Sequence, residues 1–515
     1  MDTVSIDFKK PCRVYFMGIG GVSMSGLAEI LRKEGFSVSG SDAKESEFTE
    51  HLKTQGIRIY IGQRAENLSS PVDYVIYTAA IHPDNPEFRE AKRQGIPMLS
   101  RAELLGQLMR CYGESIAVSG THGKTTTTSM LSLILLAAKK DPTISLGGNL
   151  DAIGGNIRVG GSETFLLEAC EYTNSFLSFF PTLEVILNIE ADHLDFFKDI
   201  DDIRHSFRRF VRRMPENGSL VIDNRIRDYR EIVGDFKGKV VTVGTEAADY
   251  YPTDIRFDER GNAAFTPTEH GKALPRIQLC VPGEHNVYNA LAALAACRLL
   301  GIPAETVREG LEAYRGTERR FEKKGEYRGA VIVDDYAHHP QEIAATLKAA
   351  KNYPHKALWC VFQPHTYTRT KALLPDFGKA LEGADHVLLA DIYAARETDT
   401  LGISSRDVAE AINADQPGKA RYFGSFGEIE DYLDKVTEPG DLVLTMGAGD
   451  IFRGTALARV LESGKDVLEL DSAALQEIGT FASTAASLST ERSGGIASIP
   501  SREDIAARVA RLGQQ

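Results

Sequence analysis

With 515 residues, the chain is too long for one compact core, and its length favours about three domains. Its 43% hydrophobic and 25% charged residues are typical of soluble globular proteins, and no apolar run is long enough to cross a membrane. The formal net charge of −13 argues against a general nucleic-acid-binding protein, which would present a basic face. Anionic substrates would need local binding groups, such as loop amides, basic side chains and Mg²⁺.

The start of the chain is acidic and polar and lacks a basic region followed by an apolar stretch, so no secretion signal is predicted. Six cysteines are scattered without the close spacing of metal ligands, which favours buried thiols in a reducing compartment. We therefore expect a cytoplasmic protein.

The first unit is a predicted strand, a glycine-rich turn at 18–26, a helix, and a second strand that leads to Ser41 and Asp42. An acid about twenty residues after such a turn is typical of β-α-β units that bind a nucleotide diphosphate and its sugar. Ser23 replaces the third glycine of the dinucleotide-binding fingerprint, which weakens the dinucleotide interpretation. The next strand ends at Thr78, which either lines a ligand crevice or is an ordinary strand exit.

A strand at 116–118, a loop ending in Gly-Lys-Thr and a helix at 129–136 predict a phosphate-binding site. Loop amides and the helix N-terminus point at phosphate oxygens, Lys124 neutralises charge, and Thr125 can hold Mg²⁺. A full P-loop would have glycine in place of Val118, so a threonine-rich turn is the alternative. The residues expected around the phosphates are Gly120, Thr121, His122, Gly123, Lys124, Thr125 and Thr126.

Two apolar strands after this loop end in acids. The strand at 165–167 runs into Glu168, and the strand at 185–189 runs into a segment that contains His193. In a parallel sheet these ends gather beside the phosphate loop, where the Mg²⁺ of bound ATP needs ligands. Solvated acids at strand ends are the alternative, although two such clusters together favour the metal-site interpretation.

A long Ala/Leu-rich helix begins near His285, Asn286 and Asn289. These side chains either cap the helix or contact an adenine base, whose donor and acceptor edge matches an amide.

Farther along, a strand at 330–333 runs into Asp335 and His338, and a strand at 359–362 runs into His365 and Arg369. The first of these ends is too rich in titratable groups for an ordinary turn. Repeated strand–helix units with polar strand ends predict a doubly wound parallel sheet.

Together these motifs resemble the Mur ligase family, the ATP-dependent amino-acid ligases of peptidoglycan precursor synthesis. The resemblance spans about residues 10–460. It rests on an ordered series of motifs: Gly18-Ile-Gly-Gly-Val-Ser-Met24, Tyr77-Thr-Ala-Ala-Ile81, Gly120-Thr-His-Gly-Lys-Thr-Thr126, Glu190-Ala-Asp-His193, Gly283-Glu-His-Asn286, Arg319-Arg-Phe-Glu322, Asp334-Asp-Tyr-Ala-His-His-Pro340 and Phe362-Gln-Pro-His365.

The resemblance implies an α/β fold in which two Rossmann-like parallel-sheet domains flank a central P-loop ATPase domain. The expected boundaries are 1–110 for the UDP-sugar domain, 111–315 for the ATP domain and 316–465 for the amino-acid domain, with a tail at 466–515. The composition of the tail predicts a Ser/Thr/Ala/Gly-rich linker at 480–498 and an amphipathic helix at 501–512. The implied substrates are UDP-N-acetylmuramate, L-alanine and ATP with Mg²⁺, handled by a monomer or homodimer without nucleic-acid or membrane partners.

The resemblance also assigns roles to residues. Lys124, His193, His338 and Arg369 are expected to be catalytic, and Thr125, Glu168 and His193 to hold Mg²⁺. The ATP site would include the phosphate loop with His285, Asn286, Asn289, Arg320 and Asp335. The UDP-sugar site would include Gly18, Gly20, Gly21, Ser41, Asp42 and Thr78. His365 and Arg369 would form the amino-acid site.

Two positions depart from the family pattern. Thr366 stands where many relatives carry arginine, which bears on the amino-acid site. The stretch comparable to the carbamoylated lysine of several Mur ligases contains Arg208 and Arg209, so we predict no such modification.

Three other functions fit parts of the sequence. A ligase that recycles muropeptides by attaching a tripeptide to the same sugar nucleotide would share the N-terminal and P-loop motifs. A nucleotide-dependent dehydrogenase would use the first β-α-β unit but leave the Gly-Lys-Thr loop unexplained. A non-catalytic nucleotide-binding protein finds support only in the tail.

Overall fold

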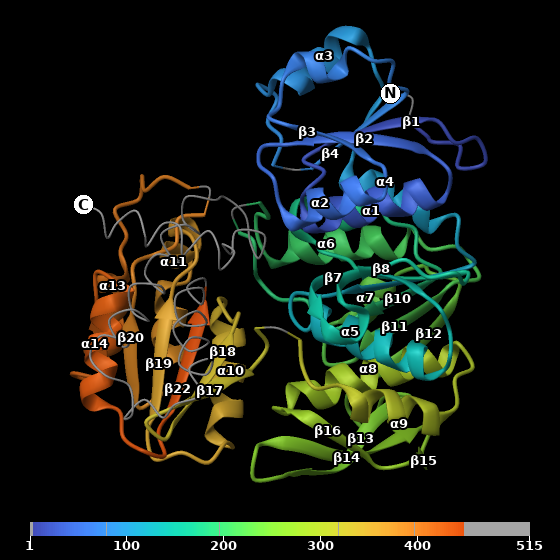
Figure 1. Cartoon of the computed structure of the whole chain (residues 1–515). Helices are drawn as coiled ribbons and strands as arrows, with labels where there is room; N and C mark the ends of the chain where they lie inside the picture. The colour runs from blue at the N-terminus through green and yellow to red at the C-terminus, as the bar shows by residue number, and fades with distance from the viewer. Residues whose placement is uncertain (1–3, 79, 195, 318, 396, 448–515) are drawn as a thin grey trace, which may run out of the picture.

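The computed structural model describes residues 4–447 apart from positions 79, 195, 318 and 396. The predicted linker and helix of the tail lie outside the described residues. Three separate sheets divide the described chain, and Figure 1 shows the first stacked on the second, with the third beside them. Within the described residues, no helix has the length and apolar character needed to cross a membrane.

The N-terminal sheet is wholly parallel and has the strand order β3-β2-β1-β4-β5. Its strands are β1 (Arg13–Met17), β2 (Ser37–Asp42), β3 (Arg58–Ile61), β4 (Tyr74–Tyr77) and β5 (Met98–Ser100). Its helices are α1 (Val22–Lys33), α2 (Glu47–Thr54), α3 (Pro86–Gln94) and α4 (Arg101–Met109), with a 3-10 turn, η1 (Ala65–Leu68). The strand order reverses between β1 and β4, where open α/β sheets bind ligands at the carboxyl ends of their strands.

The central sheet joins a parallel middle to antiparallel edges. Its strands are β6 (Glu114–Ser119), β7 (Thr143–Leu150), β8 (Gly155–Arg158), β9 (Thr164–Glu168), β10 (Leu183–Ile186), β11 (Ser219–Asp223), β12 (Lys239–Val243), β13 (Tyr250–Phe257), β14 (Asn262–Glu269), β15 (Lys272–Ala273) and β16 (Ile277–Pro282). Its helices are α5 (Lys124–Ala137), α6 (Ile200–Val211), α7 (Tyr229–Val233), α8 (His285–Leu299) and α9 (Ala304–Ala313), with 3-10 turns η2 (Asp151–Ile153) and η3 (Tyr172–Ser178). β6 lies between β9 and β10, so the three strand ends that carry the predicted phosphate and metal groups are neighbours.

The C-terminal sheet is parallel except for its first strand, and has the order β17-β18-β22-β19-β20-β21. Its strands are β17 (Glu322–Tyr327), β18 (Ala330–Asp335), β19 (Leu358–Gln363), β20 (His386–Leu389), β21 (Ala420–Tyr422) and β22 (Leu442–Gly447). Its helices are α10 (Pro340–Lys351), α11 (Tyr367–Ala372), α12 (Leu374–Leu381), α13 (Ser405–Asp415) and α14 (Phe426–Val436). The predicted fold class of three α/β units is confirmed, and the antiparallel edge strands are an addition that the sequence patterns did not indicate.

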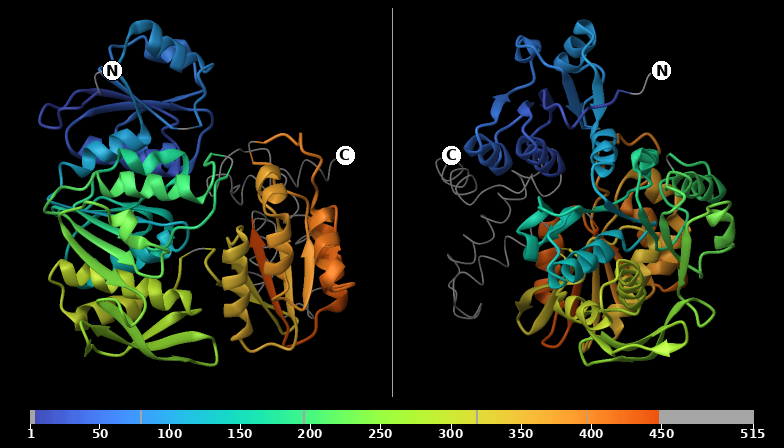
Figure 2. Two further views of the ribbon diagram at one scale, coloured as in Figure 1. Left: turned by 180° about the vertical axis from the view of Figure 1, so that it is seen from behind. Right: turned by 90° about the vertical axis from the view of Figure 1, so that its right-hand side faces the viewer.

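The hydrophobic cores divide the molecule differently from the sheets. One buried cluster joins Leu104 and Leu108 of α4 to Phe176, Phe207 and Phe210 of the central unit. In contrast, the buried clusters of the third sheet contain only residues from 330 onwards. The first two units therefore share a core, whereas the third has its own. The left-hand view in Figure 2 shows the same separation of the third unit from the other two.

Candidate active site

The phosphate loop connects β6 to α5, with Lys124 as the first residue of the helix. Gly120 and Gly123 have φ angles of +139° and +81°, which side chains with a Cβ rarely adopt. A Cβ on Gly123 would also lie 2.5 Å from the Oδ1 atom of Asn289 in α8. The loop shape therefore depends on both glycines, and α8 packs directly behind it.

Lys124 is partly buried, with 12% of its side chain exposed, and is held in place by several acceptors. Its Nζ donates to the carbonyl oxygens of Gly120 (2.5 Å) and Thr121 (2.9 Å) and lies 3.0 Å from a carboxylate oxygen of Glu171. Burial acts to lower the pKa of Lys124, but the Glu171 carboxylate outweighs it and raises the pKa above its usual value. Lys124 therefore remains a cation, poised at the phosphate loop.

Thr125 and Glu168 lie together beside this lysine. The Thr125 hydroxyl donates to Glu168 Oε2 at 2.8 Å, and the same oxygen accepts from the Gly147 amide at 2.9 Å. His193, the third predicted metal ligand, instead stacks on Tyr172 with ring centroids 4.4 Å apart. Among the described residues, no three His, Cys, Asp or Glu side chains converge as a metal site. The threonine and glutamate oxygens still form a hard-oxygen pair suited to a metal bound mainly by phosphate and water.

The central and C-terminal units meet through polar side chains. Arg369 Nη2 lies 3.3 Å from Asp192 Oδ1, and a ring nitrogen of His339 lies 3.1 Å from the Ala191 carbonyl oxygen. His122 of the phosphate loop lies 3.1 Å from Glu342 of α10. The segment after β10 and the helix start after β18 therefore face each other across this junction.

His338 and His365 lie on the C-terminal side of the junction, with ring centroids 5.6 Å apart. Burial lowers the pKa of His338 to about 4 and that of His365 to about 3, and the charge of Arg369 contributes to both shifts. Arg369 Nη1 also lies 3.3 Å from His365 Nδ1. The structure thus brings together the three C-terminal residues predicted from the sequence, with both imidazoles neutral near pH 7.

Asp335 ends β18 and is buried. Its carboxylate accepts from the amides of Phe321 and Ala337, each at 2.8 Å. Burial raises the pKa of Asp335 to about 6, although the guanidinium of Arg320 opposes the shift. The guanidinium carbon of Arg320 lies 5.7 Å from the centre of the Tyr336 ring. The predicted pair of Arg320 and Asp335 is therefore electrostatically coupled.

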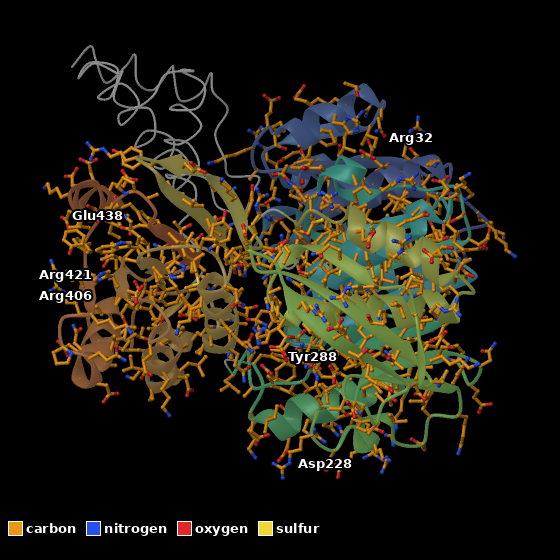
Figure 3. The ribbon with its side chains drawn as sticks, turned by 90° about the horizontal axis from the view of Figure 1, so that it is seen from below. Arg32, Asp228, Tyr288, Arg406, Arg421 and Glu438 are labelled. Atoms are coloured by element: carbon orange, nitrogen blue, oxygen red, sulfur yellow. The ribbon has the colours of Figure 1, made fainter. Side chains whose placement is uncertain are left out.

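The three polar residues at the start of α8 have different surroundings. Asn289 donates to Asn286 Oδ1 at 3.0 Å, and Asn286 donates to the Pro282 carbonyl at 2.7 Å, so these buried amides already have partners. His285 is exposed. On the same helix, Tyr288, labelled in Figure 3, carries the guanidinium of Arg225 at 3.4 Å from its ring centre. Asn289 therefore packs behind the phosphate loop and supports it, whereas the exposed His285 is accessible to the adenine base of a nucleotide.

The predicted N-terminal site also forms one cluster. Asp42 Oδ2 accepts from the Gly20 amide at 2.9 Å, which ties the end of β2 to the glycine turn. Gly18 has φ of +79°, and a Cβ there would lie 2.8 Å from Thr78 Cγ2. Gly21 directly precedes α1 and has an extended backbone. Ser41 is buried: its hydroxyl donates to Glu87 at 2.6 Å, and its carbonyl oxygen accepts from the amides of Gly18 and Ile19, each at 2.9 Å, which also ties the end of β2 to the glycine turn.

The acceptor for Ser41 is Glu87, a residue that the sequence patterns did not single out. This fully buried carboxylate accepts from Ser41 Oγ (2.6 Å), Tyr15 Oη (2.8 Å) and Asn67 Nδ2 (2.5 Å). Three donors from different elements thus converge on one acceptor below the glycine turn. Its only sequence signal is an acid in the first turn of a helix, which also fits a surface position.

We expect Glu87→Gln to lower the free energy of unfolding by about 1–3 kcal/mol, because the new amide places a donor against three donors in a buried site. Urea denaturation would measure the change. Glu90→Gln on the same helix is the matched control, since Glu90 pairs with Arg93 near the surface and its loss should cost less than about 1 kcal/mol. Equal effects of the two changes would contradict the role given to Glu87.

The two departures from the family pattern have clear positions. Thr366 has a φ of +65° and caps α11, with its hydroxyl accepting from the Arg369 amide at 3.5 Å. Arg208 and Arg209 are exposed on α6. Thr366 therefore helps to orient the first turn of the helix that carries Arg369.

Three α/β units, with a phosphate loop in the second facing histidine and arginine side chains of the third, define a three-domain nucleotide-dependent enzyme. Models of the Mur ligase catalytic domain, the Mur ligase middle domain and the Mur ligase glutamate ligase domain match residues 13–112, 118–297 and 319–449. The chain belongs to the Mur ligase family, as the ordered motifs predicted.

The similarity to known proteins covers most of the chain. The UDP-N-acetylmuramate–L-alanine ligase of Lachnospira eligens is 55% identical over 451 residues, covering 87% of this chain and 98% of that protein. The ligase of the same name from Agathobacter rectalis is 55% identical over 465 residues, covering 90% and 99%. The crystal structure of a UDP-N-acetylmuramate–alanine ligase from Thermotoga maritima matches with a TM-score of 0.72 and 30% identity, covering 88% of this chain and 100% of that one.

Proposed function

We propose that the chain is a UDP-N-acetylmuramate–L-alanine ligase, which uses ATP to form an amide bond and releases ADP and phosphate in peptidoglycan synthesis. The observation that carries the proposal is the 55% identity over 98% of a relative with that name. The junction supports it, because a partly buried lysine at a phosphate loop faces neutral histidines and an arginine, which suits phosphoryl transfer followed by acyl transfer.

In the first step, a carboxylate oxygen of UDP-N-acetylmuramate attacks the γ-phosphorus of ATP. The bond from that phosphorus to the bridging oxygen breaks, which gives an acyl phosphate and ADP. Lys124 and the amides of the phosphate loop neutralise charge that spreads over the transferring group. Thr125 and Glu168 would hold Mg²⁺, which would supply further positive charge at the phosphates, and His193 would complete this set after a movement away from Tyr172.

In the second step, the amine of L-alanine attacks the acyl carbon, and the resulting tetrahedral intermediate releases phosphate. The neutral imidazoles of His338 and His365 can accept hydrogen bonds from the amine, which orients its lone pair towards the carbon, and one of them can take the proton that the nitrogen loses as the amide bond forms. Arg369 lies next to His365 and supplies a positive charge for the anionic intermediate. Phosphate leaves readily because the first step has attached a phosphoryl group to the carboxylate oxygen, which would otherwise be a poor leaving group.

The remaining assignments follow the same division of labour. The UDP-sugar would bind at Gly18, Gly20, Gly21, Asp42 and Thr78, with Ser41 supporting the site from below. We place the domain boundaries near residues 110, 315 and 465. The substrates occur in the cytoplasm, where we expect a monomer or homodimer.

Phosphate release from ATP with UDP-N-acetylmuramate tests the function directly. L-Alanine should stimulate release strongly, and glycine and L-serine less, because their side chains differ from a methyl group in size and polarity. Stimulation only by a muropeptide tripeptide would replace the proposal with the recycling ligase. A change in NAD(P)H absorbance at 340 nm without ATP turnover would favour the dehydrogenase.

The rate of ligation should fall as the pH drops through about 6, where Asp335 becomes protonated and loses the charge that faces Arg320. This loss is not acid unfolding. The folded pKa of about 6 exceeds the unfolded value of about 3.9, so this group increases stability as the pH falls between those values. Rate profiles from pH 5 to 8 would show the effect, together with thermal melting at each pH. If the fall in rate at acidic pH were unchanged in Asp335→Asn, it would have to be assigned to another titratable group.

A further inference from the structure

His122, the second residue after the first glycine of the phosphate loop, points both ring nitrogens at carboxylates. Nδ1 lies 3.1 Å from Glu342 Oε1 on α10, and Nε2 lies 3.2 Å from Glu190 Oε2 in the segment after β10. The third titratable neighbour is His339, whose ring centre is 5.2 Å away. The side chain of His122 is only 18% exposed, so water screens these contacts poorly.

His122 has little left to offer a phosphate group. Its backbone amide donates to Asn188 Oδ1 at 2.7 Å, and its carbonyl accepts from Asn188 Nδ2 at 3.0 Å. Both ring nitrogens face carboxylates, as described above. The geometry therefore separates His122 from the neighbouring loop residues, which we expect to surround ATP.

The same carboxylates keep the ring charged. Burial acts to lower the pKa of His122, but Glu190 and Glu342 together raise it to about 10. An imidazolium has a donor on each nitrogen: Nδ1 forms a hydrogen bond with Glu342 Oε1, whereas Nε2 lies within ion-pair distance of Glu190 Oε2 but without the geometry of a hydrogen bond. At neutral pH, the contact between the loop and α10 is therefore a charge-assisted hydrogen bond, a class stronger than the neutral kind.

Glu342 carries this contact to the histidines of the C-terminal unit. Its Oε2 atom accepts from the backbone amides of His338 (3.1 Å) and His339 (3.3 Å), while Oε1 faces His122. A single carboxylate therefore joins the phosphate loop to the helix start that positions His338. These groups are 220 residues apart in the chain, so the link exists only when the two units are docked.

We propose that His122 is a positioning residue that couples the phosphate loop to the His338–His339 helix start through Glu342. It acts on the reaction by orienting the acceptor side of the site relative to the loop. The inference rests on the proposed ligase function for its kinetic consequence, but the coupling itself is a structural property that can be measured without turnover.

The kinetic experiment compares His122→Gln, Glu342→Gln and the double variant. We expect kcat with L-alanine to fall about tenfold in each single variant, with little further loss in the double variant, because both changes break one link. The dissociation constant for ATP, measured by titration calorimetry, should change by less than about twofold, since the ring does not bind phosphate. Multiplicative losses, or a weakening of ATP binding that accounts for the lost rate, would overturn the proposal.

Two further variants separate this role from a general loss of folding. His122→Lys keeps a cation near Glu342 and should retain more activity than His122→Gln, whereas an equal loss would exclude the charge as the cause. His270→Gln is the matched control, because His270 pairs with Asp249 at 3.4 Å on the exposed surface. Its kcat should match that of the unmodified protein, and a tenfold fall would overturn the proposal, because the loss in His122→Gln would then not be specific to the contact with Glu342.

Hydrogen exchange tests the coupling independently of the substrate. Amide exchange in the peptide 336–343 should rise several-fold in His122→Gln, because Glu342 loses the cation that orients it towards the His338 and His339 amides. Unchanged exchange there would overturn the proposal even if the enzyme is active. Inactivity of the unmodified protein with L-alanine, combined with raised exchange in the variant, would reject the proposed function and retain the coupling.

Discussion

Lys124→Ala should reduce kcat for ATP-dependent ligation by about a thousandfold or more, since positive charge at the transferring phosphate supplies much of the catalysis of phosphoryl transfer. The ammonium group of Lys124 lies at the phosphate loop, against the loop carbonyl oxygens of Gly120 and Thr121. Phosphate release in the presence of all substrates would measure the change. Retention of a tenth of the rate would contradict the assignment.

The same substitution should also destabilise the fold, and the two effects need to be separated. Glu171 is 2% exposed and pairs with Lys124, so removing the lysine leaves a buried carboxylate uncompensated, at about 3–5 kcal/mol. Adding Glu171→Gln should restore much of the stability without restoring activity. Lys140→Ala, just beyond the end of α5, is the matched control, because Lys140 pairs with the partly exposed Glu114.

Arg369→Ala should reduce kcat by about a hundredfold or more while leaving the affinity for ATP nearly unchanged. The arginine contacts His365 within its own unit and Asp192 across the junction, each at 3.3 Å. Its loss removes the positive charge expected at the tetrahedral intermediate and takes from the buried Asp192 its ion pair across the junction. Arg369→Lys should recover little, since one ammonium group does not reproduce the fork that reaches both neighbours.

Kinetics with varied L-alanine, combined with calorimetric titration of ATP, would check this expectation. Arg406→Ala is a suitable control, because Arg406 stacks on Tyr422 at the outer edge of the C-terminal unit in Figure 3, away from the junction. A parallel loss of ATP affinity in Arg369→Ala would indicate that this arginine belongs to the ATP site and not to the amino-acid site.

Local patterns were sufficient to predict the fold class and the placement of several candidate site residues. Glycine turns between a strand and a helix indicated the positions of both glycine loops, because positive φ angles depend on residues within one short segment. The acids at the ends of adjacent strands were predictable for a similar reason. Strands β9, β6 and β10 are neighbours in the sheet, so Thr125 and Glu168 meet without help from distant elements.

Contacts between distant segments were not predictable from the sequence. Glu87, Glu171 and Glu342 are acids in ordinary positions, and only the folded chain shows which buried donors converge on them. Asn286 and Asn289 show the converse case. The sequence suggests that these amides could contact an adenine base, but in the structure each forms a hydrogen bond within the protein. The position of His193 after a strand end and the family motif both predict a metal ligand, whereas in the structure its ring stacks on Tyr172.

The hydrocarbon contact between the first two units has a consequence for the order of events. At Gly106, α4 packs so tightly that a Cβ would lie 1.8 Å from the Ser178 carbonyl oxygen. Because the two units also share one hydrophobic cluster, they cannot part without exposing apolar surface. The third unit meets the second through ion pairs and hydrogen bonds, which water can replace. The first two units would thus hold the sugar carboxylate and the nucleotide as one rigid body. The third unit, which would bind the amine of L-alanine, could move separately. Separate movement of the third unit would let it close over the acyl phosphate once this intermediate has formed, and so shield it from hydrolysis.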